Sequence, residues 1–216
     1  MEKRGRFITM EGIEGSGKTT QHQMLTSYLA QNGIDCLATK QPGGTPIGRE
    51  IRKILLHKDS VGMTPGCEAL LYLADRAQHH HEVIEPALAK GTWILSDRYQ
   101  DSTMAYQGAA RGLPQNELDY IFKLVTNNLQ PDLTILLDLD PEAGVGRALA
   151  RLANDQMSQE EGRFEDEALD FHKAVRASFL EFAAKEPHRY AIINADQKPD
   201  EVSSDIQAVL KERGLV

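Results

Sequence analysis

The stretch GIEGSGKT, residues 12 to 19, constrains the fold more than any other feature, because only Glu11 separates it from the apolar run FITM at 7 to 10. It matches G-x-x-x-x-G-K-[ST], a loop whose backbone amides surround a phosphate chain. Gly12, Gly15 and Gly17 let those amides turn inward without Cβ collisions, and the positive end of the following helix points at the anion. With a strand before and a helix after, we interpret the match as a nucleoside triphosphate site rather than a chance pattern.

Every residue of this loop is a candidate nucleotide ligand. Lys18 is expected to reach the outer phosphates, and the hydroxyl of Thr19 is expected to bind Mg²⁺. The predicted ligands in the loop are Gly12, Ile13, Glu14, Gly15, Ser16, Gly17, Lys18, Thr19 and Thr20.

Apolar runs recur along the chain, separated by segments long enough for helices. They lie at 6–11, 34–40, 91–96, 132–139 and 189–194. Several of them are nearly continuous rather than alternating, which is typical of parallel strands covered by helices on both faces. The pattern therefore predicts an α/β fold with a mostly parallel sheet.

Helical spacing predicts one helix over 19–32 and another over 67–90, with Pro86 breaking or kinking the second. The segment 141–170 combines helix formers with a charged middle. It is predicted to be a helical lid, at about 145–166, with its tip at 154–162.

Composition limits the remaining choices. At 216 residues the chain is expected to form one domain, and 24 basic against 32 acidic residues argue against broad nucleic-acid binding. No apolar run approaches the roughly 20 residues of a membrane helix, so we expect a cytoplasmic protein. Cys36 and Cys67 lack the spacing of a metal site or a disulfide framework. On a chain with a net charge of −8, a phosphorylated substrate must be held by local positive charge.

Three classes of protein use such a phosphate loop: GTP switches, ATP-driven motors and small-molecule kinases. The N-K-x-D motif that reads guanine does not occur, and a motor would usually be larger. A kinase needs a second anionic pocket facing the first, because phosphoryl transfer depends on positioning and charge neutralisation.

Two segments offer that second pocket. SDRYQDSTMAYQG, residues 96–108, follows an apolar run, so Asp97 is a candidate to hold a water on Mg²⁺ and Arg98 to clamp a phosphate. Arg49 and Arg52 follow a Pro-Gly-Gly turn and share one helix face. Taken alone, these residues also fit a surface ion pair or a solvated helix face.

In order and spacing, several motifs together resemble those of bacterial thymidylate kinases, P-loop nucleoside monophosphate kinases. The motifs are GIEGSGKTT, QPGGTPIGREIR, LYLADR, SDRYQDSTMAYQG, PDLTILLD and GRFE, and the similarity runs from residue 6 to about 196. The resemblance implies a single domain over 1–216 with a three-layer P-loop NTPase fold, a five-stranded parallel sheet and a lid. It implies transfer of phosphate from ATP to dTMP with Mg²⁺, and a homodimer.

The resemblance also implies a binding site for dTMP. Arg52 and Arg98 match residues that hold its phosphate, and Glu14 matches an acidic residue near the sugar 3′-hydroxyl. Tyr106 matches the residue against the sugar, where a ribose 2′-hydroxyl would collide. Tyr72 matches a ring that stacks on thymine.

The base-reading residues follow from the same resemblance. Arg76 matches the residue that contacts the base carbonyl, and Thr103 and Gln107 match the pair that reads the pyrimidine edge. The chain departs from the family pattern at Gln41, where an acidic residue is usual, and at Tyr72, where phenylalanine is commoner.

The lid completes the predicted machinery. In the family branch that IEGSG resembles, lid arginines stabilise the transferring phosphoryl group. Arg151 and Arg163 are the candidates, joining Lys18 and Arg98 as catalytic residues, while Arg147 is expected to stack over adenine. Arginines four apart on a helix also fit a solvated face.

Two other functions remain open at this level. A kinase for another pyrimidine monophosphate would share the loop and lid but alter the pyrimidine readers. A nucleotide-gated binding protein would keep the loop but lack convergent arginines for an acceptor.

If the lid arginines act on the transferring phosphate, Arg151→Ala or Arg163→Ala lowers turnover far more than ATP affinity. Steady-state kinetics together with direct ATP binding measures the two effects separately. Equal losses in both would count against the lid assignment.

Overall fold

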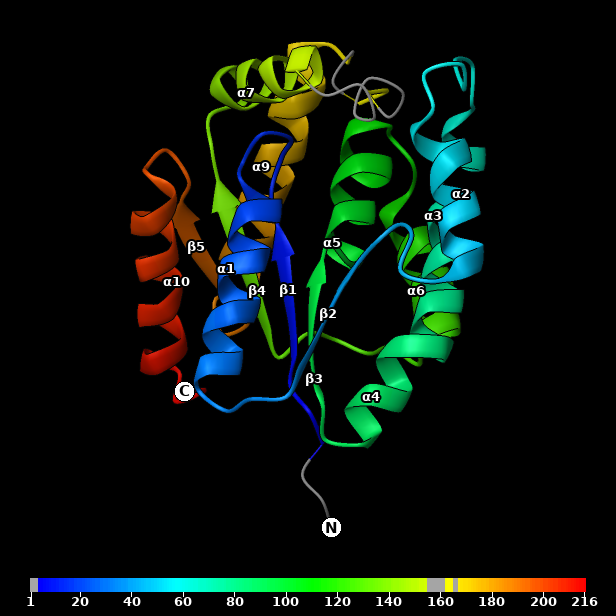
Figure 1. The fold of residues 1–216 in the computed structure, drawn as a ribbon. Helices are drawn as coiled ribbons and strands as arrows, with labels where there is room; N and C mark the ends of the chain where they lie inside the picture. The colour runs from blue at the N-terminus through cyan, green and yellow to red at the C-terminus, as the bar shows by residue number, and fades with distance from the viewer. Residues whose placement is uncertain (1–3, 155–161, 165–166) are drawn as a thin grey trace.

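Five parallel strands form one sheet at the centre of the molecule, in the order β2-β3-β1-β4-β5 (Figure 1). The computed structural model describes residues 4–154, 162–164 and 167–216. The strands are β1 Phe7–Glu11, β2 Cys36–Lys40, β3 Trp93–Asp97, β4 Leu133–Asp138 and β5 Tyr190–Asn194. Each lies within one of the five apolar runs or extends one residue beyond it, and the predicted α/β fold with a five-stranded parallel sheet is confirmed.

Helices cover both faces of this sheet. In Figure 1, α1 and α10 lie in front of the strands and α9 lies behind them. The helical elements are α1 Lys18–Gln31, α2 Pro46–Leu56, α3 Pro65–His79, η1 His80–Ile84, α4 Glu85–Ala89, α5 Gln100–Thr103, η2 Met104–Ala110, α6 Gln115–Thr126, α7 Pro141–Asn154, α9 Leu169–Lys185 and α10 Pro199–Glu212. None of the described helices is long and apolar enough to cross a membrane.

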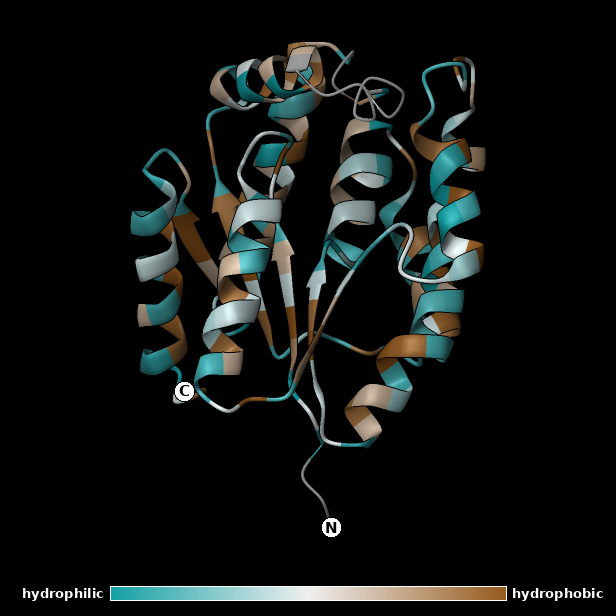
Figure 2. Cartoon of the chain, in the orientation of Figure 1, coloured by the Kyte–Doolittle hydropathy of each residue, from teal (hydrophilic) through white to brown (hydrophobic). Residues whose placement is uncertain are grey.

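Burial follows the position of each strand in the sheet. All five residues of β1 are buried, and so are the first five of β4, because helices cover both of their faces. The edge strands carry exposed apolar side chains, with Leu37 on β2 and Ile192 on β5. Figure 2 shows hydrophobic residues along much of the sheet and many hydrophilic residues on the outer helix surfaces.

The segment predicted as one helix over 67–90 is three consecutive elements. It begins earlier than expected, at Pro65, because the Thr64 hydroxyl accepts a hydrogen bond from the Cys67 amide at 3.3 Å and caps α3. A π-helical turn, η1, then precedes α4, and the Glu85 amide donates to the His80 carbonyl. Pro86 lies in the first turn of α4, where its missing N–H costs little. The break or kink in the helix that is predicted at Pro86 therefore lies just before this residue, at η1.

The predicted lid begins as α7 and returns to the fold through α9. Residues 155–161 and 165–166 of the expected 145–166 segment lie outside the described residues. The first turns of α7 lie directly over the phosphate loop: a Cβ on Gly144 would lie 2.6 Å from the Glu14 carbonyl oxygen and 2.8 Å from Ile13 Cδ1. A Cβ on Gly15, whose φ is 71°, would lie even closer to α7, 2.0 Å from the Gly144 carbonyl oxygen. The loop and α7 are thus packed backbone to backbone.

This contact predicts that Gly144→Ala destabilises the protein. The added methyl meets backbone, and overpacking of this kind costs about 1–3 kcal/mol, which lowers Tm by about 2–4 °C per kcal/mol in a chain of this size. Thermal denaturation measures the shift. Gly146→Ala is the matched control on the same helix, since a Cβ there meets nothing within 4 Å. A Tm for Gly144→Ala at or above that of Gly146→Ala would contradict the close packing.

Candidate active site

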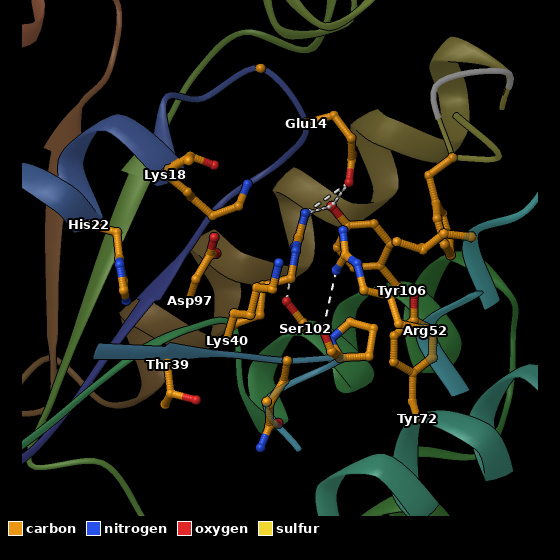
Figure 3. Close-up of a pocket in the computed structure, with 18 of the residues that line it drawn as sticks. Glu14, Lys18, His22, Thr39, Lys40, Arg52, Tyr72, Asp97, Ser102 and Tyr106 are labelled. Atoms are coloured by element: carbon orange, nitrogen blue, oxygen red, sulfur yellow. Dashed lines mark hydrogen bonds and ion pairs between the residues drawn. The ribbon is translucent and has the colours of Figure 1, made fainter. Parts of the chain in front are cut away.

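A cleft of about 970 Å³ opens at the carboxyl edge of the sheet, where all the strands end. Figure 3 shows Lys18 and Asp97 on one side of it, and Arg52, Tyr72 and Tyr106 on the other. The predicted site residues that line this cleft are Glu14, Gly15, Gly17, Lys18, Thr19, Thr20, Arg52, Tyr72, Arg76, Asp97, Arg98, Thr103, Tyr106, Gln107, Arg147 and Arg151. Gly12, Ile13 and Ser16 are buried within the loop itself. Arg49, by contrast, is exposed and does not line the cleft.

Lys18 folds back over its own loop. Its ammonium donates to the Gly12 carbonyl at 2.9 Å, the Ile13 carbonyl at 2.7 Å and the Ser16 hydroxyl at 3.3 Å. Burial, followed by the positive charge of Arg98, lowers the pKa of Lys18 to about 8. These partners place the cation at the mouth of a loop whose amides favour an anion.

Arg98 connects the phosphate loop to the segment that follows β3. Its guanidinium donates to Glu14 Oε1 at 2.9 Å, the Tyr106 hydroxyl at 3.1 Å, the Gly12 carbonyl at 3.2 Å and the Ser102 hydroxyl at 3.0 Å. The backbone of Arg98 has a φ of 70°, a left-handed conformation that a non-glycine residue adopts at a cost. That strained turn aims the side chain back across the end of the sheet.

Glu14 is held from three sides. Its Oε1 accepts from the Tyr106 hydroxyl at 2.6 Å as well as from Arg98, and His172 Nδ1 lies 3.2 Å from its Oε2. Burial works to raise the pKa of Glu14, but His172 and the charges of Arg98 and Lys18 outweigh it and hold the pKa well below the usual range. The carboxylate therefore stays ionised between the two halves of the cleft.

The predicted base-reading residues meet in a buried group. Arg76, only 2 % exposed, donates to Thr103 Oγ1 at 2.7 Å, Gln41 Oε1 at 2.8 Å and the Tyr99 carbonyl at 2.8 Å. Gln41 also contacts His79 Nδ1 at 2.7 Å. Burial and then Arg76 lower the pKa of His79 to about 4. A neutral amide at Gln41 thus joins a permanent cation to a neutral histidine.

The residues predicted to bind Mg²⁺ suit that ion chemically. Thr19 is exposed at the start of α1, and Asp97 is half-buried at the end of β3. Asp97 Oδ1 is a buried oxygen for which the described residues provide no hydrogen-bond donor. Oxygen ligands of this kind are the ones that Mg²⁺ takes, usually together with phosphates and waters.

The three candidate lid arginines lie in different places. Arg147 donates to the Ala195 carbonyl at 3.1 Å and to Asp196 at 2.7 Å, beside the loop after β5. Arg151 is exposed and lines the cleft. Arg163 does not line it and pairs instead with Glu68, while its Nε donates to the Leu55 carbonyl at 2.7 Å.

Sequence reasoning missed several buried residues that contact the site, among them His172 and Glu68. His172 lies in α9, 158 residues from Glu14, and no local pattern connects them. Glu68 contacts Gln107 and Arg163. It precedes Tyr72 by four residues and Arg76 by eight, so helical spacing places all three on one face of α3. That spacing is a signal that could have found Glu68.

A parallel sheet with a glycine-rich phosphate loop after β1, and a cleft at its carboxyl edge, defines a P-loop nucleotide-binding protein. A family model described as thymidylate kinase matches residues 10–206. The chain therefore belongs to the thymidylate kinase family, as its motifs indicated.

Individual relatives agree over nearly the whole chain. A thymidylate kinase of Maridesulfovibrio salexigens is 51% identical over 207 residues, which cover 96% of this chain and 95% of that one. One from Nitratidesulfovibrio vulgaris is 49% identical over 204 residues, covering 94% and 91%. The crystal structure of thymidylate kinase from Ehrlichia chaffeensis aligns with a TM-score of 0.76 at 30% identity, covering 96% of this chain and 99% of that one.

The contact between Gln41 and His79 predicts a pH effect on stability. Since the pKa of folded His79 is about 4 against an ordinary 6.5, the unfolded chain binds a proton that the folded chain does not, so His79 destabilises the fold as pH falls through that interval. Gln41→Glu places a carboxylate on the ring nitrogen and should raise this pKa, which reduces the loss. Urea denaturation at about pH 7 and about pH 5 measures it. Gln207→Glu on α10 adds the same charge elsewhere and is the control. Equal pH dependence in the two variants would contradict the prediction.

Proposed function

We propose that this chain is a thymidylate kinase that transfers the γ-phosphoryl group of ATP to dTMP and makes dTDP for dTTP and DNA synthesis. The observation that carries the proposal is the ion pair of Arg98 with Glu14, which joins the phosphate loop to a second group of cationic and aromatic side chains in one cleft. A nucleotide-gated binding protein has no need of that second group.

On the donor side, the loop amides and Lys18 bind the phosphates of ATP, and Arg147 lies by the adenine. The hydroxyl of Thr19 would bind Mg²⁺ directly, and Asp97 would hold a water molecule bound to Mg²⁺. When bound, the ion supplies positive charge between the phosphates.

On the acceptor side, Arg52 and Arg98 hold the phosphate of dTMP, and Tyr72 stacks on the thymine. Arg76, Thr103 and Gln107 read the base edge. Tyr106 and Glu14 lie against the sugar, where the bulk of Tyr106 favours deoxyribose. The Arg98 guanidinium then faces both the loop and the incoming phosphate.

Transfer is in line, with the acceptor phosphate oxygen as nucleophile. That oxygen is already an anion, so the reaction needs no general base and no covalent intermediate on the protein. Lys18 and Arg98 neutralise the charge of the transferring phosphoryl group from the side of the phosphate loop, and the lid arginines Arg151 and Arg163 neutralise it from the side of the lid. Arg163 pairs with Glu68 in this structure, so its part in transfer requires it to leave that carboxylate.

We also infer that the protein is a cytoplasmic homodimer that binds neither nucleic acid nor membrane. The adjacent helices α3 and α6 carry exposed apolar side chains at Leu70, Tyr120 and Leu124, which suit a second copy of the chain. A monomer by sedimentation at micromolar concentration would argue against the dimer.

The function is tested by a coupled assay of ADP release with dTMP, dUMP, dCMP and AMP as acceptors. We expect the highest kcat/KM with dTMP, and loss of the rate when EDTA removes Mg²⁺. If no acceptor stimulates ADP release, the enzyme proposal is wrong. Preference for another monophosphate would replace thymidylate as the substrate.

A further inference from the structure

Glu68 is a buried carboxylate that the proposed reaction does not use. It lies in the first turn of α3, is 1 % exposed, and contacts Gln107, which lines the cleft. The Nε2 of Gln107, on η2, donates to its Oε1 at 2.9 Å. This contact joins two elements 39 residues apart in the sequence.

Two guanidinium groups hold the Glu68 carboxylate in place. Arg111 donates its Nε to Oε1 and its Nη2 to Oε2, both at 3.3 Å, and Arg163 Nη2 donates to Oε2. Arg111 is itself anchored by Glu167 at 2.5 Å and lies over the Phe171 ring. Since a guanidinium can only donate, both arginines favour the ionised, acceptor-only form of Glu68.

The charge of Glu68 decides which end of Gln107 it contacts. Burial works to raise the pKa of Glu68, but hydrogen bonds from Gln107 and Arg163 and the charge of Arg111 lower it overall. An ionised carboxylate only accepts hydrogen bonds, so the amide NH₂ of Gln107 must face it. The opposite orientation would bring two acceptors together in a buried place, which is costly.

The other end of the amide is therefore turned away from Glu68. Within the part of the chain that the structure describes, the bond to Glu68 is the single hydrogen bond of the Gln107 side chain. Gln107 also lines the cleft, next to Thr103 and Arg76. Its carbonyl oxygen is thus available as an acceptor for a ligand.

We propose that Glu68 is a specificity-determining positioning residue, which fixes the Gln107 amide so that its carbonyl oxygen selects pyrimidines with a proton on N3. Thymine and uracil carry that proton, whereas cytosine presents a lone pair there. The inference rests on the proposed function in one respect, that Gln107 reads the pyrimidine edge. Glu68 itself touches no substrate.

Glu68→Gln tests this directly. Arg111 and Arg163 both donate to Oε2, so the oxygen of the new amide takes that place and its NH₂ takes the place of Oε1. The NH₂ then loses the bond from Arg111 Nε and faces Gln107, which must reverse. We expect kcat/KM for dTMP and dUMP to fall about tenfold or more relative to dCMP. The reason is that the reversed Gln107 amide presents its NH₂, and no longer its carbonyl oxygen, to the N3–H of thymine or uracil, so two donors face each other. We expect this fall in kcat/KM to come mainly from a higher KM. A purely structural role would lower all three acceptors equally.

Three variants serve as controls. Glu68→Asp keeps an acceptor-only group and should retain the ratio of dTMP to dCMP. Glu167→Gln removes an ion pair from the same cluster without touching Gln107 and should also retain it. In a Gln107→Ala background, Glu68→Gln should not reduce the ratio of dTMP to dCMP any further, because the side chain through which Glu68 acts is then absent.

If Glu68→Gln does not fold, Gln107→Glu replaces it. The introduced carboxyl can donate to Glu68 only while protonated, which leaves its other oxygen toward the ligand as in Gln107. Once ionised it is repelled by the Glu68 carboxylate and no longer held in that orientation, so the preference for dTMP over dCMP should persist at acid pH and fall as pH rises. A ratio that follows pH as in the wild type would overturn the inference.

The outcomes separate the two proposals. If the wild type phosphorylates none of the acceptors, the proposed function fails. If it phosphorylates dTMP and Glu68→Gln lowers dTMP, dUMP and dCMP by the same factor, the role of Glu68 fails and the function stands.

Discussion

The ion pair between Arg98 and Glu14 is the interaction on which the rest of the cleft depends. It joins residues 84 positions apart, one in the loop after β1 and one in the turn after β3. Breaking a buried pair leaves an uncompensated charge, which is strongly unfavourable. The left-handed backbone of Arg98 and the approach of Tyr106 both serve this contact. It holds the phosphate loop and the turn after β3 together across the cleft.

A buried charged network surrounds that pair. Glu11, at the end of β1, accepts hydrogen bonds from the Tyr99 amide and the Ser102 hydroxyl, and burial followed by Asp101 raises its pKa to about 7. Lys18 is pushed toward neutrality by the same burial. Phosphates that enter the cleft would favour the charged form of Lys18, because opposite charges interact strongly where water is excluded.

Much of the fold could be predicted because its signals are local. The strands follow from apolar runs of five or six residues, and the phosphate loop follows from eight consecutive positions. The prediction of one helix over 67–90 is less accurate. The start of α3 depends on its Thr64 cap, and the π-helical turn η1 depends on packing, and residue spacing reports neither. The resemblance to thymidylate kinases is confirmed, whereas the acceptor-binding residues that it implies stay predictions.

By itself, the sequence determined the alternation of strands and helices along the chain, the phosphate loop and the family. Each of these is encoded within a few neighbouring residues or a set of motifs. Only the tertiary structure decided that His172 touches Glu14, that Arg163 pairs with Glu68, and that Glu68 accepts a hydrogen bond from Gln107. Those contacts join distant segments, and their strength comes from burial, which exists only once the chain has folded.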